Sequence, residues 1–185
     1  MEFRIQHFEH IDSTNSYLLG LARRGEPEGL VITAEYQSNG RGRLDRKWTS
    51  PRGENLLFSF LLRPPFPASK APLLTQQTCQ AVVYTLDRLF GIRSTVKKPN
   101  DVMVGGKKIC GILVESESTS SARTIDFAVV GIGLNVNSEP VNLCKNATSV
   151  LAETGRITDL GYILDAFLSN FSDLYSKNML SHFKH

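Results

Sequence analysis

The segment 37–50, which reads QSNGRGRLDRKWTS, holds three arginines and a lysine within seven residues, opposed by a single acid. An arginine side chain recognises phosphate or carboxylate through a planar and permanently charged pair of donors. Two glycines free the backbone between the arginines, and Trp48 could stack on a flat ring or pack in the core. We predict a loop that becomes ordered over a bound anion. A solvated basic loop is the plainer alternative.

The segment 97–111, KKPNDVMVGGKKICG, combines two lysine pairs with a Pro-Asn-Asp turn. Asp101 could hold Mg²⁺ through oxygen and Asn100 could bind a polar ligand edge, although both residue types also favour plain turns. The pair Gly105-Gly106 between two β-like runs predicts a tight hairpin, because such turns need positive φ. Successive side chains of a strand point to opposite faces. One lysine of the second pair therefore points inward, and we expect it to be Lys108.

Two further segments give weaker signals. Ser13-Thr14-Asn15 is rich in N-cap residues and is first of all a helix cap, but hydroxyls and N–H groups at a helix start could also bind a polar ligand head. Gly131 and Gly133 interrupt the β-rich segment 125–136, and glycines within a strand often mark the close approach of a ligand or of another backbone. The sequence contains no Walker A, GxGxxG or GxSxG motif and no histidine spacing typical of zinc.

The elements that must position these residues follow from apolar patterns. Helical periodicity over 71–90 and 160–175 predicts two long helices, and a third should follow the cap at residue 13. Strands adjacent in sequence, with helices between and after them, indicate an α+β domain. We expect a mixed, largely antiparallel sheet with helices packed mainly on one face. The chain opens in a strand-like segment around Phe3, Ile5 and Phe8, and the further predicted strands are 30–34, 55–62, 93–96, 102–104, 107–115 and 125–136.

Composition narrows the class of protein. The 185 residues are 41% hydrophobic and 21% charged, which is typical of one globular domain and excludes wholesale disorder or a coiled coil. The apolar runs are far shorter than the roughly 20 residues of a membrane helix. Three scattered cysteines fit a reducing cytoplasm better than a disulfide framework. A net charge of only +3, gathered in two basic segments, favours a compact anionic ligand, and we expect no nucleic-acid partner.

Taken in chain order, these motifs resemble the catalytic domain of biotin–protein ligases. The resemblance covers about residues 8–137, and the arginine loop together with the Pro-Asn-Asp turn is its most specific part. The residues that carry it are Ser13-Thr14-Asn15, Glu35-Tyr36-Gln37, Gly40-Arg41-Gly42-Arg43, Arg46-Lys47-Trp48, Ser50-Pro51, Asn55-Leu56, Leu62-Arg63-Pro64, Lys97, Pro99-Asn100-Asp101, Lys108, Gly111-Ile112-Leu113-Val114-Glu115 and Gly131-Ile132-Gly133-Leu134-Asn135.

The resemblance implies a fold of the class II aminoacyl-tRNA synthetase and biotin ligase type, and it implies an ATP-dependent ligase. The family forms biotinyl-5′-AMP from biotin and Mg·ATP and then passes the biotinyl group to one lysine of a carrier domain. The implied partner is the biotin carboxyl carrier domain of acetyl-CoA carboxylase. Biotin is then the substrate, and ATP and Mg²⁺ are the cofactors. Whether the protein forms a homodimer stays open.

The resemblance also implies a role for each matching residue. Lys108, Arg43 and Asp101 are the catalytic candidates, with Lys108 bridging the biotin carboxyl and the phosphate. Asp101 would serve the metal or the attacking acceptor lysine. The residues implied to bind biotin are Ser13, Thr14, Asn15, Gln37, Arg41, Gly42, Arg43, Lys108, Gly111 and Gly133. The residues implied on the ATP side are Arg46, Trp48, Lys97, Asn100 and Asn135.

Some features depart from the family pattern. The family commonly has Trp where Lys98 stands and Gly where Asp45 stands. Larger members carry an N-terminal winged-helix domain, and most carry a C-terminal SH3-like domain. We expect residues 1–185 to be one catalytic domain without either addition, and therefore without a repressor role.

Three rival functions differ in what they predict. A lipoate- or octanoyl-protein transferase shares the fold class but lacks the GRGR…RKW arrangement, so competition between biotin and lipoate separates it. A biotin sensor without catalysis would bind biotin but fail to exchange pyrophosphate into ATP. A nucleic-acid binder would lose affinity steeply as salt rises.

Overall fold

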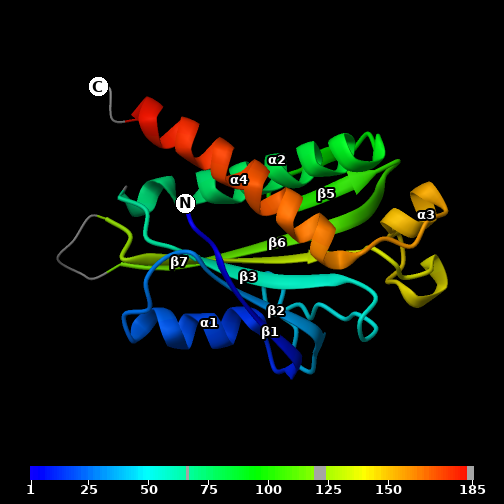
Figure 1. Cartoon of the computed structure of the whole chain (residues 1–185), viewed down its shortest axis with the longest axis horizontal. Helices are drawn as coiled ribbons and strands as arrows, with labels where there is room; N and C mark the ends of the chain where they lie inside the picture. Colours follow the sequence, from blue (N-terminus) through cyan, green and yellow to red (C-terminus); the bar gives the residue numbers. More distant parts are fainter. Residues whose placement is uncertain (66, 119–123, 183–185) are drawn as a thin grey trace.

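The computed structural model describes residues 1–65, 67–118 and 124–182, which form one seven-stranded sheet with helices on both faces (Figure 1). None of the helices in these ranges is both long enough and apolar enough to cross a membrane. The strands are β1 (Arg4–Ile11), β2 (Leu30–Gln37), β3 (Leu56–Leu62), β4 (Thr95–Lys97), β5 (Asp101–Val104), β6 (Lys107–Glu117) and β7 (Phe127–Leu134). The helices are α1 (Thr14–Arg23), α2 (Ala71–Phe90), α3 (Val150–Thr154) and α4 (Leu160–His182), with short 3₁₀ turns η1 (Ala68–Lys70) and η2 (Pro140–Asn142).

The strand order in the sheet is β1-β2-β3-β7-β6-β5-β4. β1 pairs with β2 in parallel, and every other neighbouring pair is antiparallel. The central strands β3 and β7 are buried along their whole length, which requires apolar cover on both faces of the sheet. The pairing of the strands confirms the expected mixed, largely antiparallel sheet.

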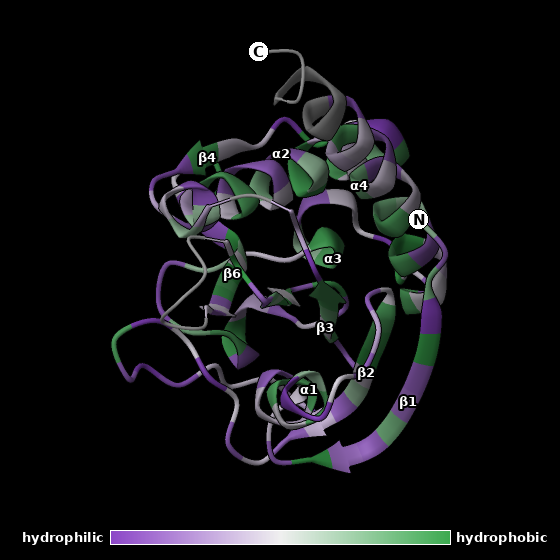
Figure 2. Cartoon of the chain, turned by 90° about the vertical axis from the view of Figure 1, so that its left-hand side faces the viewer, coloured by the Kyte–Doolittle hydropathy of each residue, from purple (hydrophilic) through white to green (hydrophobic). Residues whose placement is uncertain are grey.

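The larger hydrophobic core lies between the sheet and the helices α2 and α4. Phe58 of β3 lies 5.3 Å from Phe167 of α4 between ring centroids, and Phe60 lies 4.7 Å from Phe171. Large aromatic side chains contribute much of the buried apolar area in a core. Figure 2 shows α2 and α4 together on one side of the molecule and α1 on the other. The long helices thus share one face, as the sequence predicts.

Helix α1 covers the opposite face with a smaller core, where Leu18 and Ala22 pack with Ile32 and Val129. The side chain of Ser13 caps this helix by accepting a hydrogen bond from the N–H of its third residue. The predicted helix after residue 13 is confirmed. Beside its first turn, this face of the sheet opens into a cavity.

The alternation of β7 determines which of its residues reach that cavity. Val130, Ile132 and Leu134 belong to the larger core beneath α2 and α4. Successive side chains of a strand point to opposite faces. Gly131 and Gly133 therefore lie on the α1 face, where the absence of side chains leaves room for other groups.

Most predicted elements are confirmed, with shifted ends. The helix at 71–90 and the turn at Gly105-Gly106, with φ of 55° and 81°, lie where the sequence places them. β6 continues beyond the predicted range to Glu117, and the strand predicted at 93–96 lies further along the chain. The sequence analysis missed α3, because a helix of five residues is too short to show periodicity.

Arg63 holds the end of α1 against the sheet. Its guanidinium donates to the backbone oxygens of Ala22, Glu26 and Asp126 at 2.8–3.1 Å.

Replacing Arg63 with Met should lower the free energy of unfolding by about 2–4 kcal/mol, since several carbonyl groups lose a charged donor. Urea denaturation measures this. The matched control is Arg4→Gln, which removes an exposed pair with Glu26 and should cost less than about 1 kcal/mol. Equal losses in both variants would contradict this role for Arg63.

Candidate active site

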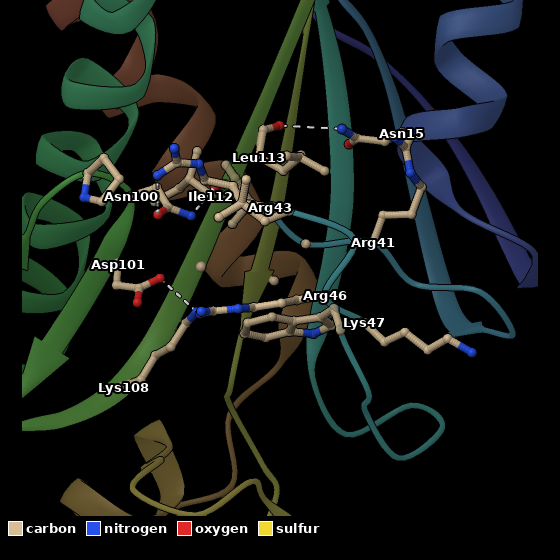
Figure 3. A pocket seen from close by; sticks show the side chains of 18 of the residues that line it. Asn15, Arg41, Arg43, Arg46, Lys47, Asn100, Asp101, Lys108, Ile112 and Leu113 are labelled. Atoms are coloured by element: carbon tan, nitrogen blue, oxygen red, sulfur yellow. Dashed lines mark hydrogen bonds and ion pairs between the residues drawn. The ribbon is translucent and has the colours of Figure 1, made fainter.

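A cavity of about 390 Å³ opens on the α1 face of the sheet, a size typical of small-molecule sites. The start of α1 and the end of β2 lie on one side of it, and the turn before β5 lies on the other (Figure 3). The glycines of β6 and β7 line it between these walls, and the loop 41–48 completes the lining. The segments that the sequence analysis singled out are therefore brought together at one place.

The lining of the cavity is strongly cationic. Among the described residues, Asp101 is the one acid that lines it. An excess of one charge sign in a concave site raises the local concentration of ligands of the opposite sign. The cavity therefore suits a ligand that carries several negative charges. The basic residues that line it are Arg41, Arg43, Arg46, Lys47, Lys97, Lys98 and Lys108.

Lys108 extends from β6 into the cavity, as the sequence predicts, whereas Lys107 is exposed. The Nζ of Lys108 lies 2.7 Å from Oδ1 of Asp101 (Figure 3). The same ammonium lies 5.3 Å from the ring centroid of Trp48, within cation–π range. A carboxylate and an aromatic face thus hold this cation inside the cavity, where it can meet an anionic ligand.

Trp48 packs against the backbone of two paired strands at Gly111 and Gly133. A Cβ at Gly133 would lie 2.3 Å from the indole, and one at Gly111 would lie 2.8 Å from it. The indole therefore occupies space that only glycine leaves free. Its Nε1–H is buried and has no acceptor among the described residues. An unpaired buried donor costs about 1–3 kcal/mol, so an acceptor atom of a ligand would be stabilised here.

Gly133→Ala should displace Trp48 and reduce ligand binding about tenfold or more, because the new methyl group and the indole cannot share the space. Trp48 is the single tryptophan of the chain, so intrinsic fluorescence reports its displacement directly. The control is Gly20→Ala within α1, where the nearest atom would lie 3.9 Å away and alanine favours the helix. An unchanged emission spectrum in Gly133→Ala would show that Trp48 does not depend on this glycine.

The wall beside α1 carries a continuous row of hydrogen-bonded side chains. The backbone N–H and the hydroxyl of Thr14 lie 2.8 and 3.1 Å from Oε1 of Gln37. The same hydroxyl lies 2.7 Å from Ser59 Oγ, and Ser59 donates to Oδ1 of Asn15. Asn15 fits only because Gly131 has no side chain, since a Cβ there would lie 2.0 Å from Oδ1. This row offers fixed donors and acceptors to a polar ligand head.

The arginine loop has backbone structure of its own. The N–H of Trp48 donates to the carbonyl of Gly40 at 3.0 Å, which closes the segment 40–48 into a small hairpin. At its tip Leu44 and Asp45 adopt φ of 54° and 58°. Aspartate tolerates this left-handed conformation better than most residues. Asp45 is therefore compatible with the turn at this position.

Two arginines of the loop contact the walls. Arg41 pairs with Glu115 of β6 through two hydrogen bonds of 3.0 and 2.7 Å. Arg43 donates to Oδ1 of Asn100 at 3.3 Å, and Nδ2 of Asn100 donates to the carbonyl of Ile112 at 2.8 Å. Both ends of the Asn100 amide are thus used within the protein. The ordering of the loop over an anion stays a prediction.

Nearly all residues predicted for the site line the cavity, and Asn135 is the exception. Asn135 is buried at the end of β7, where its Nδ2 donates to the carbonyl of Thr148 at 3.0 Å. Its role toward a nucleotide stays a prediction. Ser59 was not predicted, because it lies in the apolar run of β3, and Glu115 was given no role although it ends the matching segment 111–115. The predicted residues that line the cavity are Ser13, Thr14, Asn15, Gln37, Arg41, Gly42, Arg43, Arg46, Trp48, Lys97, Asn100, Asp101, Lys108, Gly111 and Gly133.

The described residues hold no group of three or more His, Cys, Asp or Glu side chains that could bind a metal ion. The cysteines do not supply a nucleophile here. Burial raises the pKa of the Cys79 thiol to about 11, and the nearby charge of Asp101 adds to this shift. Burial likewise raises the pKa of Cys110 well above its ordinary value. Both thiols stay protonated near neutral pH, so the chemistry of the cavity rests on its cations, Asp101 and the polar row.

Comparison with protein families matches residues 7–135 to the biotin/lipoate A/B protein ligase family. A bifunctional ligase/repressor BirA from Bacillus spizizenii is 35% identical over 173 residues, which are 91% of this chain and 53% of that protein. A biotin–[acetyl-CoA-carboxylase] ligase from Paracoccus denitrificans is 35% identical over 168 residues, which are 87% of this chain and 68% of that protein. The chain spans about half the length of the first of these relatives.

Among solved structures, a biotin protein ligase from Aquifex aeolicus in complex with biotin and ATP superposes with a TM-score of 0.79. The two chains are 31% identical, and the match covers 94% of this chain and 71% of the other. The sheet and helices described above are therefore shared with a solved protein of this family.

Proposed function

Because this chain belongs to the biotin/lipoate A/B protein ligase family, we propose that it activates biotin with ATP and transfers the biotinyl group to a lysine of a biotin carboxyl carrier domain. The observation that carries this proposal is the layout of the cavity, in which a fixed polar row meets a cluster of seven cations. Biotin has a polar head and an anionic tail, and ATP brings further negative charge. The two relatives are themselves known as ligases, one of them a biotin–[acetyl-CoA-carboxylase] ligase, which supports the same activity.

The polar row favours biotin over lipoate. The biotin head is a cyclic urea with N–H donors and a carbonyl acceptor, whereas lipoate ends in an apolar dithiolane. Thr14, Asn15 and Gln37 are placed to hydrogen-bond such a urea. A dithiolane could form no hydrogen bonds with this row and would displace the water that solvates it, so it gains less on binding than a urea does.

In the first half-reaction a carboxylate oxygen of biotin attacks the α-phosphorus of ATP. The bond to the bridging oxygen breaks, and pyrophosphate leaves with the electron pair. The protein must place two anions together and stabilise the charge that develops on the phosphates. Lys108 would bridge the biotin carboxylate and the α-phosphate, and Arg43 and Arg46 would neutralise the departing pyrophosphate.

An Mg²⁺ ion that accompanies ATP fits this cavity with one protein ligand. Mg²⁺ near nucleotides is commonly held by one or two carboxylates together with phosphate oxygens and waters. Asp101, the one acid in the lining among the described residues, would supply that carboxylate. When bound, the ion would screen the phosphate charge. The basic residues of the lining serve the same purpose from the protein side.

In the second half-reaction the amine of the carrier lysine attacks the carbonyl carbon of the adenylate. The bond from that carbon to the phosphate oxygen breaks, and AMP leaves. An amine must lose a proton to act as a nucleophile, and lysine has an ordinary pKa of about 10.4. Asp101 would orient this amine and accept its proton. Asp101 thus has two candidate roles, toward the metal and toward the acceptor.

The state of the cysteines supports an inference about the compartment. All three are free, and two of them are buried. Free thiols persist in a reducing environment. We place the protein in the cytoplasm, where its proposed carrier substrate would also be made.

The proposal is tested by measuring exchange of labelled pyrophosphate into ATP with biotin, lipoate or octanoate as the acid. We expect exchange with biotin alone, followed by transfer to a purified carrier domain that gains the mass of one biotinyl group. Exchange that depends on lipoate instead would overturn the substrate assignment. Biotin binding without any exchange would identify a sensor rather than a ligase.

A further inference from the structure

Glu115 of β6 connects three parts of the molecule, although it lies outside the residues that line the cavity. Its carboxylate accepts two hydrogen bonds from Arg41, and it accepts one from Nδ2 of Asn15 at 2.9 Å. Arg41 belongs to the arginine loop and Asn15 to α1. The carboxylate therefore ties the loop and the helix to the same strand. Its side chain is 24% exposed, so this contact is partly shielded from water.

Glu115 and the backbone carbonyl of Leu113 together fix the direction of the polar row, because both groups can only accept hydrogen bonds. Nδ2 of Asn15 faces Glu115 and also the carbonyl of Leu113, and Figure 3 shows the second of these contacts. Oδ1 of Asn15 must therefore face Ser59. Ser59 then donates its proton to Oδ1 and keeps its lone pairs for the Thr14 hydroxyl. The pattern of donors and acceptors that the cavity presents thus depends in part on a residue outside it, which makes the shorter of the two contacts with Asn15.

We propose that Glu115 is a positioning residue that sets this pattern for the ligand head group and holds Arg41 of the loop against β6. The inference rests on the proposed function, since the head group in question is the urea of biotin. Glu115 touches neither the ligand nor the reacting atoms. Its loss should therefore weaken biotin binding far more than it slows the chemical step.

Glu117 provides a matched control two residues along the same strand. Its carboxylate pairs with Arg23 of α1 through hydrogen bonds from Nε and Nη2, and this contact lowers the pKa of Glu117. Glu117 and Arg23 both lie outside the cavity lining. Glu117→Gln thus removes the same charge and a similar arginine pair from β6 without touching the polar row.

The test compares Glu115→Gln with Glu117→Gln in biotin titrations and in pyrophosphate exchange. For Glu115→Gln we expect the Kd and KM for biotin to rise about tenfold, which corresponds to the loss of one or two charged hydrogen bonds. We expect kcat to fall less than about threefold and the KM for ATP to stay within about twofold. Glu117→Gln should stay within about twofold of the unchanged chain in every constant. Glu115→Asp, which keeps an acceptor-only group, should recover part of the biotin affinity.

Trp48 fluorescence supplies a second readout, because the single tryptophan lies in the loop that Arg41 ties down. We expect its emission to shift to longer wavelength in Glu115→Gln and not in Glu117→Gln. Equal biotin affinity in these two variants, or parallel losses of kcat and of affinity for both substrates, would overturn the proposal. Absence of biotin-dependent exchange in the unchanged chain would instead overturn the proposed function, and the fluorescence comparison would still test whether Glu115 holds the loop.

Discussion

Lys108→Gln should slow formation of biotinyl-5′-AMP by about 100- to 1,000-fold and weaken biotin binding by less than about tenfold. In the free protein the Lys108 ammonium already pairs with Asp101 at 2.7 Å. A biotin carboxylate must share this cation with Asp101, so its net gain on binding is small. The proposed transition state would add charge on the α-phosphate and on departing pyrophosphate, where the charge of Lys108 would act most strongly.

Rapid quenching of single-turnover reactions measures adenylate formation, and calorimetric titration measures biotin binding separately. The matched control is Lys107→Gln, since Lys107 is the neighbouring lysine and is exposed outside the cavity lining. It should leave both quantities within about twofold. Adenylate formation within threefold of the unchanged chain in Lys108→Gln would remove Lys108 from the mechanism.

Much of the site could be predicted from the sequence because its chemistry is concentrated in short segments. The hairpin turn at Gly105-Gly106 leaves two choices for the inward lysine, and Lys108 lies in the cavity, as predicted. The expected alternation with Cys110 does not hold, because the β5–β6 register shifts at Val102/Met103 and Cys110 lies with Ile109 in the core beneath α2 and α4. The glycines at 131 and 133 likewise predicted a close approach within β7, and the structure shows which groups make it.

The partners of these residues could not be predicted, because they depend on pairing between strands that are distant in sequence. Ser59 reaches Asn15 only because β3 pairs with β7 so that Ser59 lies opposite Gly131. The indole of Trp48 reaches the space over Gly133 from the arginine loop, which is also distant in sequence. The buried position of Asn135 follows from the chain turning toward α3, an element too short to leave a periodic pattern.

Asp101 differs from the other predicted residues because the structure gives it an additional partner. The sequence suggests a carboxylate that serves either the metal or the acceptor lysine, or one that only completes a turn. The ion pair with Lys108 adds a further role, in which Asp101 holds that lysine in place. Asn in its place keeps the size and an oxygen that can accept a hydrogen bond from Lys108, but it removes the charge. Asp101→Asn therefore separates these roles.

We expect Asp101→Asn to slow transfer from supplied biotinyl-5′-AMP to the carrier lysine by about 100-fold, and to slow adenylate formation by less than about tenfold. The carrier amine would then have no carboxylate to take its proton among the described residues that line the cavity. Raising the pH from about 7 to about 9 should narrow the deficit in transfer, because more of the lysine, with an ordinary pKa near 10.4, is then already deprotonated. Single-turnover transfer at several pH values measures this.

The control is Asp45→Asn, which removes an exposed acid at the loop tip and should leave both half-reactions within about twofold. If adenylate formation collapses in Asp101→Asn while transfer from supplied adenylate is nearly normal, Asp101 serves the nucleotide and its metal. If both steps slow equally, and the double variant that also carries Lys108→Gln is no slower than Asp101→Asn alone, Asp101 acts by holding Lys108. A variant that is normal in both steps, with an unchanged pH profile, would show that Asp101 only completes a turn. Removing the group that accepts the proton of the amine should change how the rate of transfer depends on pH.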